Sequence, residues 1–84
     1  MFELFSEGRA ERDLKRLPAE VFARVVEAIQ GLRDNPRPPG CRKLTGAERD
    51  WRIRVGDYRV VYEIDSQARA VRIMRVRHRR EVYR

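Results

Sequence analysis

The sequence contains a single cysteine, Cys41, among 84 residues. One cysteine cannot form an intramolecular disulfide, and a lone thiol fits a reducing compartment. No apolar run approaches the roughly 20 residues that a membrane-spanning helix needs. The opening stretch, MFELFSEGRAERD, is charged from Glu3 onward and lacks the apolar segment of a secretory signal. We therefore expect a cytoplasmic protein without a membrane segment.

Residues that bind metals or build common catalytic sets are also scarce. His78 is the only histidine, and one histidine with one cysteine makes no recognisable metal-ligand set. The chain lacks a glycine-rich phosphate loop and a Ser/His/Asp combination. We expect no metal and no cofactor, so any chemistry must come from ordinary side chains.

Acidic residues are few in the second half of the chain, where arginine is abundant. Residues 1–48 hold nine basic and eight acidic residues, whereas residues 49–84 hold eleven basic and five acidic ones. The whole chain carries a net charge of +7. Such asymmetry suggests a polyanionic partner, nucleic acid first. An arginine-rich proteome would give the same composition without such a partner.

The spacing of apolar residues changes from helical to strand-like near the middle of the chain. Residues 2–5 are a candidate edge strand, and residues 6–34 predict a helical hairpin with Ser6 as its N-cap and Pro18 at its joint. A proline-rich loop over 35–46 leads to alternating segments at 51–55, 58–64 and 70–78. The last segment fits one apolar face only with a bulge, whose position the pattern leaves open. Residues 1–84 thus predict a single α+β domain, an N-terminal helical hairpin packed on a small antiparallel β-sheet.

A tight turn at Gly56-Asp57 fixes the register of the first two alternating segments. Apolar residues then pair on one face: Val55 with Tyr58, Ile53 with Val60, and Trp51 with Tyr62. The same register sets Arg54 directly opposite Arg59 on the other face, with Arg52 nearby. Like charges in this position are destabilising, and a phosphate held by the arginine forks would relieve them. The alternative is three solvated arginines on an exposed face.

The C-terminal stretch HRREVYR adds further candidate chemistry. Histidine, here His78, can carry protons near neutral pH. Arg79 can stabilise charge that develops on a phosphate, and Tyr83 can stack on a base or orient a sugar. Alone, a single histidine is more often structural, and a terminal basic run is more often a solvated tail.

Four stretches, in this order and at these spacings, resemble the RelE/ParE superfamily of toxins from toxin–antitoxin pairs, on the RelE side: DLKRLP, AIQGLRDNPRPPGCRKLTG, WRIRVGDYRVVYEID and VRHRREVYR. The resemblance implies a fold similar to microbial ribonucleases and a toxin that cleaves mRNA in the ribosomal A site without a metal. In that reaction the 2′-hydroxyl attacks the adjacent phosphate and leaves a 2′,3′-cyclic phosphate and a 5′-hydroxyl. The implied partner is a cognate RelB-like antitoxin with an acidic wrapping segment, and DNA would be contacted only through that antitoxin.

The resemblance also assigns site residues, which are Arg52, Arg54, Arg59, His78, Arg79 and Tyr83. Some relatives carry lysine where this chain has Arg52 and Arg54, and others use a glutamate in the proline-rich loop, which has no acid here. Arginine cannot accept a proton, so His78 is the first candidate for the general base. Alternatively, the arginines act only by orienting the 2′-hydroxyl and stabilising the phosphorane. The general acid is either Arg79 or His78.

Two other functions remain open from the sequence. One is a ParE-like inhibitor of DNA gyrase on the same fold, although such relatives tend to lack the sheet arginines and the terminal His and Tyr. The other is a catalytically inactive toxin fold that serves as partner of a DNA-binding antitoxin.

Overall fold

The computed structural model describes residues 1–44, 46 and 49–82. In chain order the elements are β1 (Glu3–Ser6), α1 (Gly8–Lys15), α2 (Ala19–Gly31), β2 (Arg42–Lys43), β3 (Asp50–Val55), β4 (Tyr58–Asp65), β5 (Ala70–His78) and α3 (Arg79–Val82). The strands form one five-stranded sheet in the order β1-β5-β4-β3-β2. β1 runs parallel to β5, and the other neighbouring strands are antiparallel.

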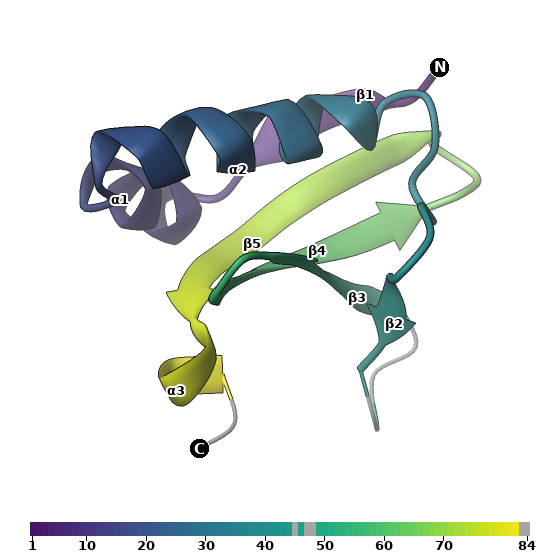
Figure 1. The fold of residues 1–84 in the computed structure, drawn as a ribbon. Coiled ribbons are helices and arrows are strands. Elements are labelled where there is room, and N and C mark those ends of the chain that lie inside the picture. Colours follow the sequence, from purple (N-terminus) through teal and green to yellow (C-terminus); the bar gives the residue numbers. More distant parts are fainter. Residues whose placement is uncertain (45, 47–48, 83–84) are drawn as a thin grey trace.

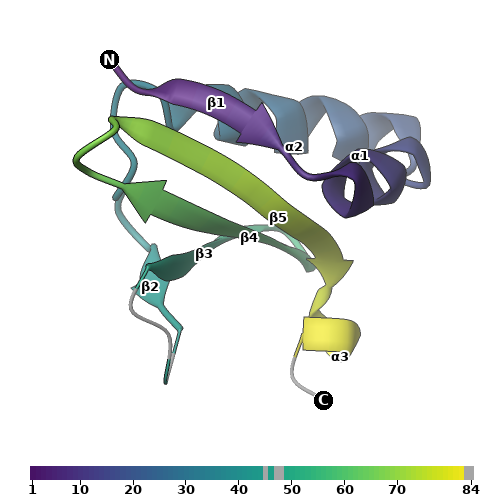
Figure 2. The same ribbon diagram turned by 180° about the vertical axis from the view of Figure 1, so that it is seen from behind.

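Helices α1 and α2 cover one face of the sheet, while α3 and β2 lie at the two ends of its opposite side (Figure 1). The view from behind shows β1 running beside β5 and leading directly into α1 (Figure 2). This arrangement confirms the expected α+β architecture with an N-terminal helical hairpin on the sheet. None of the helices described here has the length and apolar composition of a membrane-spanning segment.

Ser6 does not cap the first helix, contrary to the sequence prediction. It is the last residue of β1 and pairs with Ile73, and the next amide, that of Glu7, donates to the Ile73 carbonyl at 2.9 Å. Glu7 therefore occupies the N-cap position of α1 and makes no side-chain capping bond. Ser6 cannot serve as the cap because pairing with β5 continues to the end of β1.

The hydrophobic core lies between α2 and the covered face of the sheet. The α2 stripe contributes Val25 and Ile29, with Leu32 just beyond the helix. The sheet contributes Ile53, Val55, Val60, Tyr62, Ile64, Val71, Ile73 and Val76. Full burial of a Val, Leu or Ile side chain stabilises the fold by about 1.5–3 kcal/mol. This core fixes which face of each strand is turned away from the helices.

The proline-rich loop is tied to this core by Tyr62. The Tyr62 ring is fully buried, and its hydroxyl donates to the Pro36 carbonyl at 2.7 Å. Burial raises the pKa of the Tyr62 hydroxyl, so it stays protonated and remains a donor. The loop expected over 35–46 also contains strand β2. With two residues, β2 is too short to give an alternating pattern in the sequence.

The predicted bulge lies at Met74 in β5. Val61 pairs with Arg75 and Tyr62 with Ile73, so Met74 has no opposite residue in β4. The extra residue lets Val71, Ile73 and Val76 all be buried on the core face. After the bulge, the residues of β5 that point to the core are the even-numbered ones, Val76 and His78, instead of the odd-numbered ones.

Candidate functional site

The face of the sheet opposite α1 and α2 carries a group of cations that we call the arginine face, made of Arg42, Arg52, Arg54 and Arg59. The predicted hairpin register is confirmed, because Val55 pairs with Tyr58, and Arg54 with Arg59. Gly56 has a φ of +59°, as the tight turn requires. The arginine face also extends beyond the hairpin, since Arg42 of β2 lies directly opposite Arg52.

The three hairpin arginines differ sharply in exposure. Arg54 is exposed, whereas Arg52 and Arg59 retain only 8% and 5% of their accessible surface. The alternative interpretation of the sequence, three solvated arginines, is therefore wrong for Arg52 and Arg59. Guanidinium groups are rarely buried unless polar groups surround them.

Arg59 is held by the turn that it follows. Its Nη1 donates to the carbonyls of Gly56 at 3.1 Å and Tyr58 at 3.0 Å. These main-chain acceptors offset part of the repulsion from Arg54, and sequence reasoning missed them because turn carbonyls leave no side-chain signal. The Arg59 Nε is buried and has no hydrogen-bond partner among the residues that the structure describes. A buried donor without an acceptor costs about 1–3 kcal/mol.

Arg79 directly follows β5, the strand beside β4, and lies next to the same turn. Its backbone amide donates to the Asp57 carbonyl at 2.7 Å. Its Nε lies 3.9 Å from the Asp57 carboxylate, in an exposed ion pair. The turn at Gly56-Asp57 thus gathers Arg54, Arg59 and Arg79, three of the six predicted site residues, at one end of the sheet.

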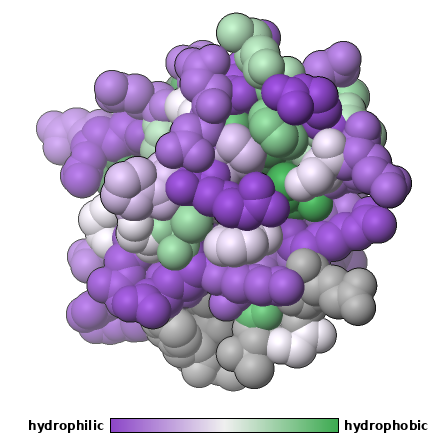
Figure 3. Space-filling view, turned by 90° about the vertical axis from the view of Figure 1, so that its right-hand side faces the viewer, coloured by the Kyte–Doolittle hydropathy of each residue, from purple (hydrophilic) through white to green (hydrophobic). Residues whose placement is uncertain are grey.

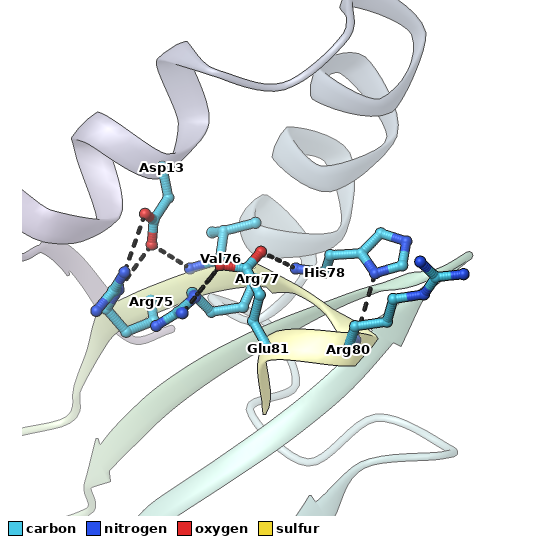
Figure 4. A network of polar contacts seen from close by, with 7 residues as sticks. All are labelled: Asp13, Arg75, Val76, Arg77, His78, Arg80 and Glu81. Atoms are coloured by element: carbon cyan, nitrogen blue, oxygen red, sulfur yellow. Dashed lines mark hydrogen bonds and ion pairs between the residues drawn. The ribbon is translucent and has the colours of Figure 1, made fainter. Parts of the chain in front are cut away.

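His78 does not lie on the arginine face. It pairs with Tyr58, on the core-facing side of the sheet, and the two rings meet edge to face at 5.3 Å between centroids. Its Nδ1 accepts the Arg80 amide at 3.3 Å (Figure 4). The bulge at Met74 causes this placement, because without the extra residue His78 would share a face with Arg59. Tyr83, the remaining predicted site residue, lies outside the described residues.

Two carboxylates hold the last part of β5 and α3 (Figure 4). Asp13 of α1 accepts from Arg75 Nε at 2.8 Å and from the Val76 amide at 2.9 Å. Burial opposes ionisation of Asp13, but these hydrogen bonds outweigh it and lower its pKa below 3.8. Glu81 accepts from Arg77 at 2.9 Å and from the His78 amide at 3.3 Å, and the Arg77 bond lowers the pKa of Glu81.

Asp13 and Glu81 form ion pairs with two arginines of β5 that would otherwise add to the arginine face. Arg77 is aligned with Arg59 and Arg75 with Val61, yet their guanidinium groups are paired to Glu81 and Asp13. Arg54 and Arg59 have no such carboxylate among the described residues. In the same part of the chain, no three His, Cys, Asp or Glu side chains come together as metal ligands would.

Residues 6–83 match the family described as the ParE toxin of type II toxin–antitoxin systems, parDE. The chain is 40% identical to toxin RelG of Mycobacterium tuberculosis over 79 residues, covering 89% of this chain and 87% of that protein. It is 41% identical to toxin RelE of the same organism over 76 residues, covering 89% of this chain and 78% of that protein.

A solved structure extends the likeness to the fold. The toxin–antitoxin complex RelBE2 of M. tuberculosis contains a chain that superposes with a TM-score of 0.81 at 32% identity, covering 92% of this chain and 96% of that one. The match spans both the helical hairpin and the sheet that carries the arginine face. The chain therefore belongs to the RelE/ParE superfamily of toxins of type II toxin–antitoxin systems.

Proposed function

We propose that this toxin is a ribosome-dependent endoribonuclease that cleaves mRNA in the ribosomal A site without a metal. The observation that carries the proposal is that Arg54 and Arg59 lie directly opposite each other, with Arg54 exposed and neither paired to a carboxylate among the described residues. A phosphate oxygen is the acceptor that best matches a guanidinium fork. RNA supplies such a phosphate at every nucleotide.

In the proposed reaction the 2′-hydroxyl oxygen attacks the adjacent phosphorus. A new P–O2′ bond forms, the P–O5′ bond breaks, the 2′-hydroxyl loses its proton and the departing 5′-oxygen gains one. Negative charge builds on the non-bridging oxygens in the phosphorane, and donors fixed around those oxygens lower the barrier. Arg59 is such a donor, because the Gly56 and Tyr58 carbonyls already hold its guanidinium in place.

The other arginines have distinct parts in this proposal. Arg54, which is exposed, binds the incoming phosphate, and Arg52 adds positive charge along the same strand. Arg79, beside the turn, stabilises the departing 5′-oxygen. Tyr83 is assigned to stacking on the substrate. His78 is the base that the sequence suggests first, but its ring faces Tyr58, so orientation and charge stabilisation by arginine account better for the chemistry.

The proposed partner is a cognate RelB-like antitoxin with an acidic segment. The related M. tuberculosis structure is a toxin–antitoxin complex, and the net charge of +7 on this chain favours an acidic partner. A partner that binds only the folded toxin would also stabilise it. We expect the acidic segment to cover the arginine face, and we place toxin, antitoxin and ribosome together in the cytoplasm.

Expression of the chain without its antitoxin tests the proposal. Growth should arrest, and mapped mRNA 5′ ends should show new cuts within codons. The exposed Lys15 on α1 offers a matched control, since Lys15→Ala also removes one cation yet should leave the cuts unchanged. Growth arrest with intact mRNA would refute the nuclease proposal.

A second candidate follows from the ParE description of the matched family. A gyrase inhibitor of this fold would arrest growth without cutting mRNA, and the purified protein would block DNA supercoiling. A chain that did neither would fit an inactive partner of a DNA-binding antitoxin. The sheet arginines favour the nuclease over both.

A further inference from the structure

A basic hollow lies on the opposite side of the short strand β2 from the arginine face. It has a volume of 360 Å³ and sits where the proline-rich loop, the start of β3 and the β4–β5 turn meet. Its lining includes three cations, one aromatic ring and two polar side chains: Arg37, Lys43, Arg49, Trp51, Ser66 and Gln67. Figure 3 faces this end of the molecule and shows a mainly hydrophilic surface with small hydrophobic areas.

The guanidinium of Arg37 lies over the indole ring of Trp51 in this hollow. The guanidinium carbon of Arg37 lies 5.1 Å from the centroid of the indole ring. Trp51 is half-buried against the core, whereas Arg37 is exposed. A guanidinium that lies over an aromatic ring keeps its solvent side available to a nucleobase and its N–H groups available to a phosphate.

The hollow carries a net positive charge, because its three cations outnumber Asp65, the one carboxylate in its lining. Arg37 and Lys43 have no ion pair among the described residues, and Arg49 approaches Asp65 only at 3.8 Å on an exposed surface. Exposed pairs of that kind contribute little to stability. An anion in the hollow would therefore meet positive charge without displacing a strong internal pair.

Strand β2 connects this hollow to the arginine face. Arg42 lies opposite Arg52, on the arginine face, and Lys43 lies opposite Trp51, on the other face. Because β2 is one of the two edge strands of the sheet, one polyanion crossing that edge would meet a cation on each side. Trp51 and Arg54 are three positions apart in one strand, about 10 Å along it.

From this arrangement we propose that the Trp51 hollow is a second RNA-binding site, which holds a nucleotide of a single RNA strand that crosses β2 from the arginine face. The Arg37–Trp51 pair receives the base, Lys43 and Arg49 bind the phosphate, and Ser66 and Gln67 hydrogen-bond to the base edge or sugar. An acidic protein segment could pair with the same cations. It would have no base to place on Arg37 and Trp51 or to hydrogen-bond with Ser66 and Gln67. The site rests on the proposed function only in taking RNA as the ligand.

Trp51 is the only tryptophan of the chain, so its fluorescence reports on this hollow directly. The 84-residue chain would be titrated with a single-stranded RNA oligomer whose 2′-hydroxyls are methylated, which prevents cleavage. We expect saturable quenching, with the dissociation constant raised at least fivefold by Lys43→Ala or Arg37→Ala. Lys15→Ala, which removes the only other lysine of the chain, should leave it within twofold.

Several outcomes would overturn the site. Unchanged Trp51 fluorescence on RNA addition, or equal weakening by Lys15→Ala and Lys43→Ala, would mean that RNA binds only through overall charge. Quenching that required double-stranded RNA would contradict the single-strand assignment. Quenching by the purified antitoxin but not by RNA would make the hollow a protein contact instead.

Failure of the proposed function gives a different result. Arg54→Ala should abolish mRNA cutting while Trp51 is still quenched by the methylated oligomer. If the wild-type chain cuts no mRNA but shows Lys43-dependent quenching, the second site stands and the nuclease assignment falls. If mRNA is cut but Trp51 does not respond, the reverse holds.

Discussion

Arg54 and Arg59 lie directly opposite each other across β3 and β4, yet Arg54 is exposed and Arg59 is 5% exposed. The turn carbonyls of Gly56 and Tyr58 hold the buried guanidinium, while the exposed one has no carboxylate partner among the described residues. In this pair, Arg59 is a hydrogen-bond donor fixed in place, and Arg54 is a donor that is accessible to a ligand. Such a pair fits a site that binds a phosphate and then stabilises the charge that develops on it.

The repulsion in this pair predicts a trade-off between stability and function. Arg54→Glu places a carboxylate opposite Arg59 and should stabilise the fold by about 0.5–1 kcal/mol, because opposite charges across a strand pair are favourable. The same change should abolish RNA cleavage, since it brings negative charge to the proposed phosphate site. Urea unfolding and a cleavage assay measure the two effects. If the variant were less stable than Lys15→Glu, repulsion between Arg54 and Arg59 would not be a significant cost.

The position of His78 predicts that it is dispensable for proton transfer. His78→Ala should keep cleavage within about threefold of the wild type, because the ring faces Tyr58 and not the arginines. His78→Phe, which keeps the ring contact with Tyr58, separates packing from chemistry. If both variants lost cleavage by about 100-fold or more while folded, His78 would have to turn to the arginine face during the reaction.

Asp13 predicts an acid-sensitive contribution to stability. Asp13→Ala removes the bonds to Arg75 and to the Val76 amide and should cost about 2 kcal/mol at pH 7. Because the pKa of folded Asp13 lies below its usual 3.8, this stabilisation is fully present above that pH and is lost as the pH falls through the folded value. The difference between wild type and variant should therefore shrink towards pH 3. Glu11→Ala, an exposed change on the same helix, should cost under 0.5 kcal/mol at every pH; a constant Asp13→Ala penalty down to pH 3 would contradict this account.

The sequence predicted the hairpin well and the end of β5 poorly, for one physical reason. Alternating apolar residues on both sides of Gly56-Asp57 admit a single register, so the positions of Arg54 and Arg59 followed directly. In β5, the bulge at Met74 shifts the alternation by one residue and sends His78 to the core-facing side. A bulge leaves only a broken pattern in the sequence, which indicates its existence but not its place.

Other features depend on contacts that no local pattern encodes. Asp13 and Arg75 are 62 positions apart, and only the packing of α1 against β5 brings them together. The burial of Arg59 depends on carbonyls of the backbone, and strand β2 is only two residues long. Sequence patterns show side-chain periodicity, so main-chain acceptors and very short strands escape them.

The central claim is that the fixed guanidinium of Arg59 stabilises the transition state of RNA cleavage. Its most direct test is the single-turnover cleavage rate on mRNA-programmed ribosomes for the wild type, Arg59→Ala, Arg59→Lys and Lys15→Ala, each checked for folding by urea unfolding. We predict a loss of about 100-fold or more for Arg59→Ala, a loss of about tenfold for Arg59→Lys, which keeps the charge but not the fork, and no loss for Lys15→Ala. A folded Arg59→Ala protein that cleaves at the wild-type rate would contradict the claim.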